Sequence, residues 1–159
     1  MTDLLQSPSV QLLVFSIDGS HYAVRLLIVE RVIPMVEVSP LPNAPAITLG
    51  VINYHGNIVA VVDIRRRLNG SSREYGLADK LVVATTARRM LFFPVDEVLG
   101  VREVALDSVA APNSILPGIG HVEGMVSLPD SVLFIHDLEM FLSLDEEQQL
   151  SEALAEMMT

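Results

Sequence analysis

The chain has 159 residues, no cysteine and a net charge of −10. This length suits one domain that buries a core, and a composition of 50% hydrophobic and 19% charged residues excludes general disorder. The missing cysteines exclude disulfides, thiolate metal sites and a cysteine nucleophile, and they suit a reducing cytoplasm. The acidic charge argues against nucleic acid as a partner, because phosphates require Lys and Arg.

The first half is predicted to contain two β-hairpins joined by an extended connection. Strands at 11–17 and 21–24 flank an Asp-Gly turn, which is a strong hairpin signal. Residues 25–33 fit a short helical turn that runs into a strand. The proline-rich stretch 39–45 is predicted to be extended, because proline lacks the N–H that a strand ladder needs. A second hairpin is predicted at 49–62, with its turn at Gly56-Asn57.

A short helix is predicted at residues 63–68, because Asp63 is a good N-cap residue. The basic run Arg65-Arg66-Arg67 falls inside this segment. We expect these arginines to form the solvated face of the helix. Residues 69–76 are predicted to be a polar loop.

The second half is predicted to form strands near 80–86, 89–93, 98–104, 121–127 and 131–136, with a loop at 110–120 and a short helix at 137–142. Ser143 to Glu146 is a capping-box sequence. An amphipathic stripe follows it, made of Leu150, Ala153, Leu154, Met157 and Met158. We expect this helix, residues 144–159, to pack on its own domain. Many short β segments with Pro/Gly turns indicate small barrels rather than a parallel α/β sheet.

The second half of the chain also repeats the first. Residues 12–33 match 81–102 at a shift of 69 residues, and residues 49–68 match 123–142 at a shift of 74. The second match places Gly50 on Gly124 and Asp63 on Asp137. Two units suit a pair of small subdomains that share one core. The domain is therefore expected to span 11–143, after a tail at 1–10.

No constellation of catalytic residues is apparent. The sequence lacks zinc-binding histidine pairs, a P-loop, a nucleophile elbow and a dinucleotide fingerprint. Equivalent N-caps in two repeats explain Asp63 and Asp137 more simply than a catalytic pair does. We therefore expect a binding module, not an enzyme, with no catalytic residue, cofactor or metal. Mean hydropathy is +0.45, yet no apolar stretch approaches the roughly 18 residues of a spanning helix, so membrane insertion is not expected.

Several stretches resemble the CheW-like domain. Residues 13–17 (LVFSI), followed by Tyr22-Ala23, are similar to its opening. Its most characteristic region resembles residues 39–45 (SPLPNAP), 49–56 (LGVINYHG) and 61–65 (VVDIR), and its Val-Asp-x-Val strand resembles residues 93–98 (FPVDEV). The resemblance covers about residues 11–143.

The resemblance implies a mainly β fold of two small five-stranded, SH3-like barrels packed together, with short helices and the C-terminal amphipathic helix. It also implies a non-catalytic scaffold of bacterial chemotaxis. Such adaptors couple the cytoplasmic tip of methyl-accepting chemoreceptors to the regulatory domain of a CheA-type histidine kinase in a two-component system. They act in the cytoplasm, recruited to membrane-associated receptor arrays.

The family's receptor-facing region includes a Val-x-Glu segment and an Asn-x-Arg-Gly turn. The corresponding residues of this chain are Val29, Glu30, Arg31, Asn53, Tyr54, His55 and Gly56. Arg31 stands where the family has glutamate, and His55 stands where arginine is usual. Glu30 lies one position early, and adjacent residues of a regular strand face opposite sides, so it does not simply replace the missing carboxylate. The altered pair predicts a receptor or kinase that differs from the common one.

For the family's largely apolar kinase-facing surface, the resemblance assigns Val98 and Val101, although both also fit a role as core valines. Two alternatives stay open. One is a same-fold adaptor in a motility, pilus or second-messenger pathway other than flagellar chemotaxis. The other is a small-ligand sensor or enzyme that uses the cleft between the barrels.

Overall fold

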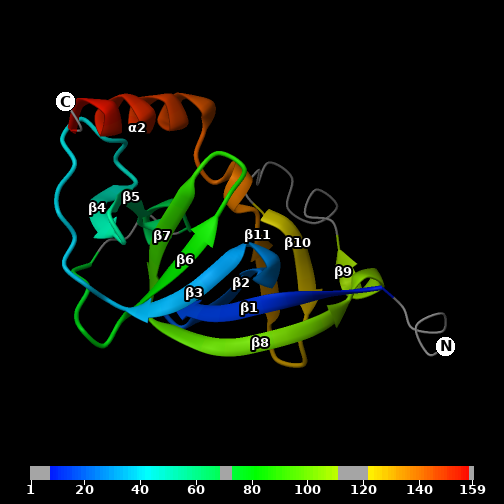
Figure 1. Cartoon of the computed structure of the whole chain (residues 1–159). Helices are drawn as coiled ribbons and strands as arrows, with labels where there is room; N and C mark the ends of the chain where they lie inside the picture. Colours follow the sequence, from blue (N-terminus) through cyan, green and yellow to red (C-terminus); the bar gives the residue numbers. More distant parts are fainter. Residues whose placement is uncertain (1–7, 69–72, 111–121, 158–159) are drawn as a thin grey trace.

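A computed structural model describes residues 8–68, 73–110 and 122–157 of the chain (Figure 1). Its strands in chain order are β1 (Ser9–Ile17), β2 (Ser20–Arg25), β3 (Val29–Pro34), β4 (Thr48–Tyr54), β5 (Asn57–Val62), β6 (Lys80–Thr85), β7 (Met90–Val95), β8 (Glu97–Ala105), β9 (Val109–Ala110), β10 (Val122–Ser127) and β11 (Val132–His136). Its helical segments are η2 (Leu26–Ile28), α1 (Ile64–Leu68), η3 (Leu106–Ser108), η5 (Leu138–Met140) and α2 (Leu144–Met157). The tail 1–10 lies mostly outside the described residues, as does the predicted loop at 110–120.

Within the described ranges the strands form two sheets, and the mainly β fold of two packed small barrels is confirmed. Barrel A has the strand order β8-β1-β2-β11-β10-β9, and barrel B has the order β3-β6-β7-β5-β4. Five strands of barrel A correspond to the five of barrel B. The sixth, β9, pairs with β10 over two residues, and its counterpart in barrel B is the single bridge between Ser39 and Val51.

Each barrel contains strands from both repeats. In barrel A the first hairpin, β1–β2, pairs with β8 and β11 and shares the sheet with β10, all three from the second repeat. In barrel B the hairpin β6–β7 of the second repeat shares a sheet with β3, β4 and β5 of the first repeat. The registers agree residue by residue. In barrel A, Tyr22 pairs with Phe134 across parallel strands, and in barrel B their repeat equivalents Leu91 and Ala60 pair in the same way. The repeat seen in the sequence is therefore a structural repeat.

Two glycines mark the same irregularity in each barrel. The β4–β5 pairing shifts register between Thr48 and Gly50, and the β10–β11 pairing shifts at the equivalent Gly124. A β-carbon on Gly50 would lie 2.1 Å from the carbonyl oxygen of Ser39, and one on Gly124 would lie 2.4 Å from a Val109 methyl group. Glycine is therefore needed where the neighbouring segment crosses the bulged strand.

The hydrophobic core has three parts. Alternate residues of the strands fill the inside of each barrel, around Leu12 and Leu133 in barrel A and around Leu81 and Phe92 in barrel B. The opposite faces of the same strands meet between the barrels in the largest cluster, which includes Phe15. Strands buried on both faces explain the high hydropathy of a chain without long apolar runs.

The C-terminal helix α2 lies along one side of the molecule, above barrel B in Figure 1. Its capping box is formed, because Ser143 Oγ accepts from the Glu146 N–H at 3.1 Å and the Glu146 carboxylate accepts from the Ser143 N–H at 2.9 Å. Leu150 and Ala153 of its apolar stripe are buried in the central cluster, while Met158 lies outside the described residues. The helix thus packs on its own domain.

The solvated face predicted for the arginine run is wrong at Arg65, whose side chain is 1% exposed. Its guanidinium binds the carboxylates of Asp18 and Asp96, the latter at 2.5 Å, and it donates to the hydroxyl of Tyr75 at 3.1 Å. These partners satisfy the charge that burial would otherwise leave unpaired. Asp63 caps α1 as predicted, by accepting from the Arg65 N–H at 3.2 Å.

The two bulge glycines generate a graded prediction. Gly50→Ala should lower the free energy of unfolding by about 3 kcal/mol, because the new methyl group meets backbone at a positive φ, and Gly124→Ala by about 1 kcal/mol, because it meets a side chain. Urea denaturation measures both. Gly76→Ala is the control, since a β-carbon there meets nothing within 4 Å. Equal free energies of unfolding for the Gly50→Ala and Gly76→Ala variants would contradict the steric requirement for glycine at position 50.

Candidate functional site

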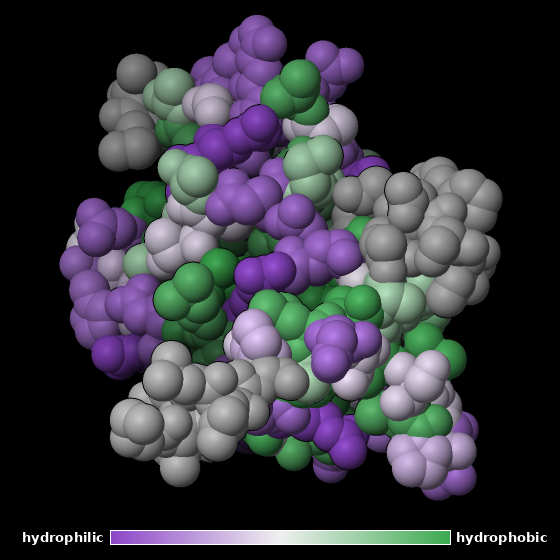
Figure 2. Space-filling view, turned by 90° about the vertical axis from the view of Figure 1, so that its right-hand side faces the viewer, coloured by the Kyte–Doolittle hydropathy of each residue, from purple (hydrophilic) through white to green (hydrophobic). Residues whose placement is uncertain are grey.

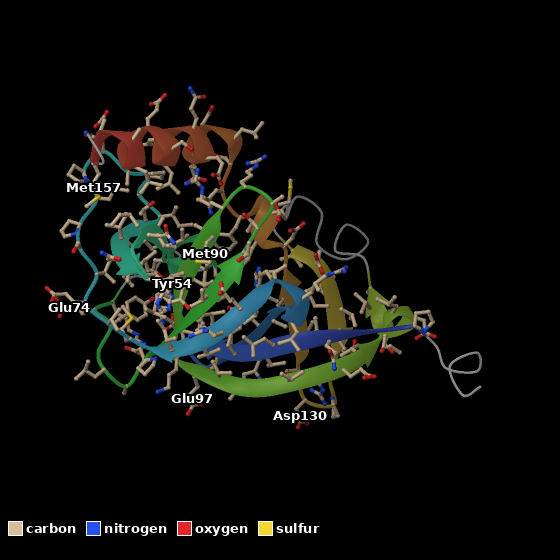
Figure 3. All side chains as sticks on the ribbon, viewed as in Figure 1. Tyr54, Glu74, Met90, Glu97, Asp130 and Met157 are labelled. Atoms are coloured by element: carbon tan, nitrogen blue, oxygen red, sulfur yellow. The ribbon has the colours of Figure 1, made fainter. Side chains whose placement is uncertain are left out.

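The strand register brings the two candidate receptor-facing segments to the same end of barrel B. Val29, at the start of β3, pairs with Ala84 near the end of β6. The β6–β7 turn follows directly, and Met90 begins β7. Since β5 runs parallel to β7, the β4–β5 turn lies at this end too. Figure 3 shows Tyr54 of β4 and Met90 of β7 in this part of the barrel, and both pack against its interior cluster.

Arg31 and Tyr54 lie over the same face of the sheet. Arg31 pairs with Val83, and Val83 pairs with Phe92, both of which belong to the interior of barrel B. Directly paired residues project to the same side, so Arg31 also projects to that side, at the exposed edge. The Tyr54 ring packs edge-on against Phe92, with 5.1 Å between the centroids. The two segments therefore flank one mouth of the barrel.

The β4–β5 turn is centred one residue earlier than predicted, on His55 and Gly56, and Asn57 already belongs to β5. Both central residues have positive φ, 52° and 88°, which is the turn geometry that matches the twist of a two-residue hairpin. The side chain of Asn53 accepts from the Gly56 N–H at 3.0 Å. The His55 ring lies 4.3 Å from that of Tyr54. This packing holds an exposed imidazole at the tip of the turn.

Regular alternation breaks down at Glu30. The β3–β6 register shifts between Val29 and Arg31, so Glu30 is the extra residue of a β-bulge. The expectation that Glu30 faces away from Arg31 assumed a regular strand, and a bulge removes that assumption. Glu30, Arg31 and His55 are all exposed, and within the described ranges none forms an ion pair or side-chain hydrogen bond. Their polar groups are available to a partner.

The two valines assigned to the kinase-facing surface differ in exposure. Val98 is half-buried and packs against the central cluster, whereas Val101 is 55% exposed. They are the repeat equivalents of Val29 and Val32, so the receptor and kinase candidates occupy matching places on the two barrels. Leu99, exposed and at the bulge of β8, is the counterpart of Glu30. The sequence analysis did not identify Leu99. A comparison of the two repeats could have done so, because Leu99 is apolar where the first repeat has the charged Glu30.

The face turned toward the viewer in Figure 2 carries apolar side chains in separate patches, interrupted by hydrophilic ones. One large exposed apolar side chain that sequence reasoning overlooked is Leu27, on the short turn η2 just before the receptor-facing segment. Its repeat equivalent is Asp96, which is partly buried in the Arg65 cluster. A position-by-position comparison of the repeats would have singled out Leu27.

Most of the groups with shifted pKa values gather around the Arg65 ion cluster, and the other, Glu146, lies in the capping box of α2. Burial raises the pKa of Asp63 and raises that of Tyr75 to about 12. A hydrogen bond from Arg73 lowers the pKa of Asp79. Shifted groups beside an open cleft can indicate catalysis, but these groups bind one another through ion pairs and hydrogen bonds that stabilise the fold. In the described part of the chain, no set of acidic and histidine side chains could hold a metal ion.

The sequence of this chain matches a known protein family over most of its length. The model of the CheW-like domain matches residues 11–152. The chain belongs to the CheW-like domain family.

Relatives in the family include three proteins named chemotaxis protein CheW. The one from Treponema pallidum is 24% identical over 89% of this chain and 86% of its own length. The one from Klebsiella aerogenes is 24% identical over 86% and 83%. The one from Thermotoga maritima is 31% identical over 65% and 68%.

The crystal structure of the scaffolding protein TtCheW from Thermoanaerobacter tengcongensis has the same fold. It superposes with a TM-score of 0.78 at 21% identity, over 87% of this chain and 96% of that one. None of the helices in the described ranges has the length and apolar character needed to cross a membrane.

Tyr54 provides a test of how the barrel mouth is built. Its hydroxyl oxygen is buried and has no hydrogen-bond partner among the described residues. Tyr54→Phe should therefore raise the free energy of unfolding by about 1 kcal/mol, because a desolvated hydroxyl is removed. Tyr54→Ala should lower it by about 3 kcal/mol, because the packing on Phe92 is lost. Urea denaturation that shows a similar loss for both variants would contradict this geometry.

Proposed function

We propose that this protein is a non-catalytic scaffold that couples the cytoplasmic tip of chemoreceptors to the regulatory domain of a CheA-type histidine kinase. The observation that supports the proposal most is the family match, which extends over both barrels and into α2. In this proposal it acts in the cytoplasm, at membrane-associated receptor arrays.

The two barrel ends suit two different partners. The mouth of barrel B presents the exposed polar side chains of Glu30, Arg31 and His55, and we assign it to the receptor. The equivalent region of barrel A presents Leu99 and Val101, which are apolar, and we assign it to the kinase. Charged contacts set specificity and association rate, whereas apolar contacts supply most of the buried area.

The altered pair at Arg31 and His55 favours a cognate receptor other than the common one. Both side chains are basic in type and exposed, so a receptor carboxylate at this site would satisfy either. An adaptor in a motility, pilus or second-messenger pathway fits this observation too. The ligand-sensor alternative is less favoured, because the cavity between the barrels measures about 230 Å³, below the roughly 300–1,000 Å³ of typical ligand sites.

Kinase binding tests the proposal directly. The protein should bind the regulatory domain of a CheA-type kinase from the same genome with a Kd in the micromolar range or tighter, as measured by titration calorimetry. Val101→Asp should weaken this binding at least about tenfold, because it places a charge in an apolar interface. The matched control is Val132→Asp, at a similarly exposed valine on β11. No binding to any such kinase domain would refute the scaffold assignment.

The receptor site generates a specificity prediction. Arg31→Glu combined with His55→Arg restores the family pair and should preserve the fold, since an exposed ion pair is worth only about 0.2–1 kcal/mol. It should weaken binding to the native receptor tip and strengthen binding to a tip from a system with the usual pair. Calorimetry with both tips measures the switch. Arg102→Glu, a charge reversal on barrel A, is the control. If the double variant prefers the same receptor tip as the wild type, this site does not determine the choice of receptor.

A further inference from the structure

Each repeat contributes a short helical segment, α1 or η5, that packs where the two barrels meet, and we call these two places the first and the second junction. At the first junction a side chain of α1 occupies the space between the barrels. There the buried Arg65 of α1 reaches the turn after β1 and the junction of β7 with β8, where Asp18 and Asp96 bind its guanidinium. The junction is closed because a cation supplied by one segment meets two carboxylates supplied by others. Charge-assisted hydrogen bonds of this kind are about twice as strong as neutral ones.

The second junction has the same geometry with different chemistry. The shift of 74 residues places Glu139 at the arginine position, and the shift of 69 places Ala87 and Leu27 at the two aspartate positions. Glu139 accepts a hydrogen bond from the Ala87 N–H at 2.5 Å, so the equivalent positions meet here as they do in the first junction. A carboxylate therefore takes the place of the cation, and both residues opposite it are neutral.

A cavity of about 230 Å³ remains at this second junction. Its lining includes three carboxylates, those of Glu123, Asp137 and Glu139, one guanidinium, that of Arg25, which is bound to Glu123, and the imidazole of His136. Ile28 contributes an apolar wall. The cavity thus has an excess of negative charge beside a hydrophobic surface, which complements the charged end and the aliphatic stem of a basic side chain.

We propose that this cavity binds an arginine or lysine side chain of the chemoreceptor tip, which supplies from outside the cation that Arg65 supplies at the first junction. The inference rests on the proposed function and specifies one contact within it. The receptor is the favoured source because Ile28 in the cavity wall is followed directly by Val29 of the receptor-facing segment, and Leu27, 91% exposed, offers apolar contact beside it. An organic cation fits better than a metal ion, since the described residues offer no group of ligands suited to a metal.

Charge-neutral variants test the cavity without removing its hydrogen bonds. Glu139→Gln and Glu123→Gln keep the size and one acceptor oxygen of each side chain. Each should weaken binding of a purified receptor-tip fragment about tenfold, the effect of losing a hydrogen bond to a charged group, and should leave kinase-domain binding unchanged. The matched control is Asp130→Asn, in the turn between β10 and β11, at the other end of β11 from the cavity. Replacing the tip's arginines and lysines one at a time by glutamine should identify one residue whose loss has no further effect in Glu139→Gln.

The possible outcomes distinguish failure of the proposed cation site from failure of the proposed scaffold function. If the tip fragment binds the wild type and both glutamine variants equally well, the inference is overturned while the scaffold function stands. If the wild type binds no receptor tip, the receptor half of the proposed function fails, and an amide NMR titration with Nα-acetyl-arginine amide decides the cavity by itself. Saturable shifts at Ala87 and Glu139 that Nα-acetyl-citrulline amide does not reproduce, and that Glu139→Gln abolishes, support a cation site. Equal shifts with both compounds, or none, overturn it.

Discussion

The buried guanidinium of Arg65 ties together segments that no single sheet connects. Asp18 lies in the turn of the β1–β2 hairpin of barrel A, Asp96 joins β7 of barrel B to β8 of barrel A, and Arg65 lies on α1, which follows β5. Loss of one member of a buried ion pair typically costs about 3–5 kcal/mol, because the remaining charge is left in a site without water. The relative placement of the barrels, and hence of both candidate surfaces, depends on this cluster together with the hydrophobic cluster between the barrels.

The candidate surfaces lie where the sheets end. In both barrels an edge strand, β3 or β8, carries a bulge at the same repeat position, with Glu30 in one and Leu99 in the other. Bulges re-aim side chains and discourage unwanted pairing of exposed edges. One structural device therefore serves both barrels, and the side chain at the bulge decides whether the surface offered to a partner is charged or apolar.

Local signals in the sequence predicted most of the elements. The Asp-Gly turn, the capping box at Ser143 and the N-cap at Asp63 all act within a few residues, and each is found in the structure. The proline-rich stretch 39–45 is not extended throughout, because it turns at Pro42-Asn43, where Asn43 has a φ of 65°. The burial of Arg65 could not be predicted, because its two acidic partners are 47 and 31 residues away in the chain. The bulge at Glu30 and the exchange of hairpins between the barrels also depend on long-range pairing. The candidate residues that the family motifs mark could thus be named from the sequence, but Leu27 and Leu99 could be recognised as exposed only in the structure.

The exchange of hairpins bears on how such a protein could arise. A chain of half this length could build the same two barrels only as a homodimer in which each copy lends its first hairpin to the other. Two-fold symmetry would make the two ends of that dimer identical, so both would bind the same partner. Joining the copies into one chain keeps the intertwined architecture but removes the symmetry requirement. Each end is then free to change alone, as the charged Glu30 and the apolar Leu99 at equivalent bulges illustrate.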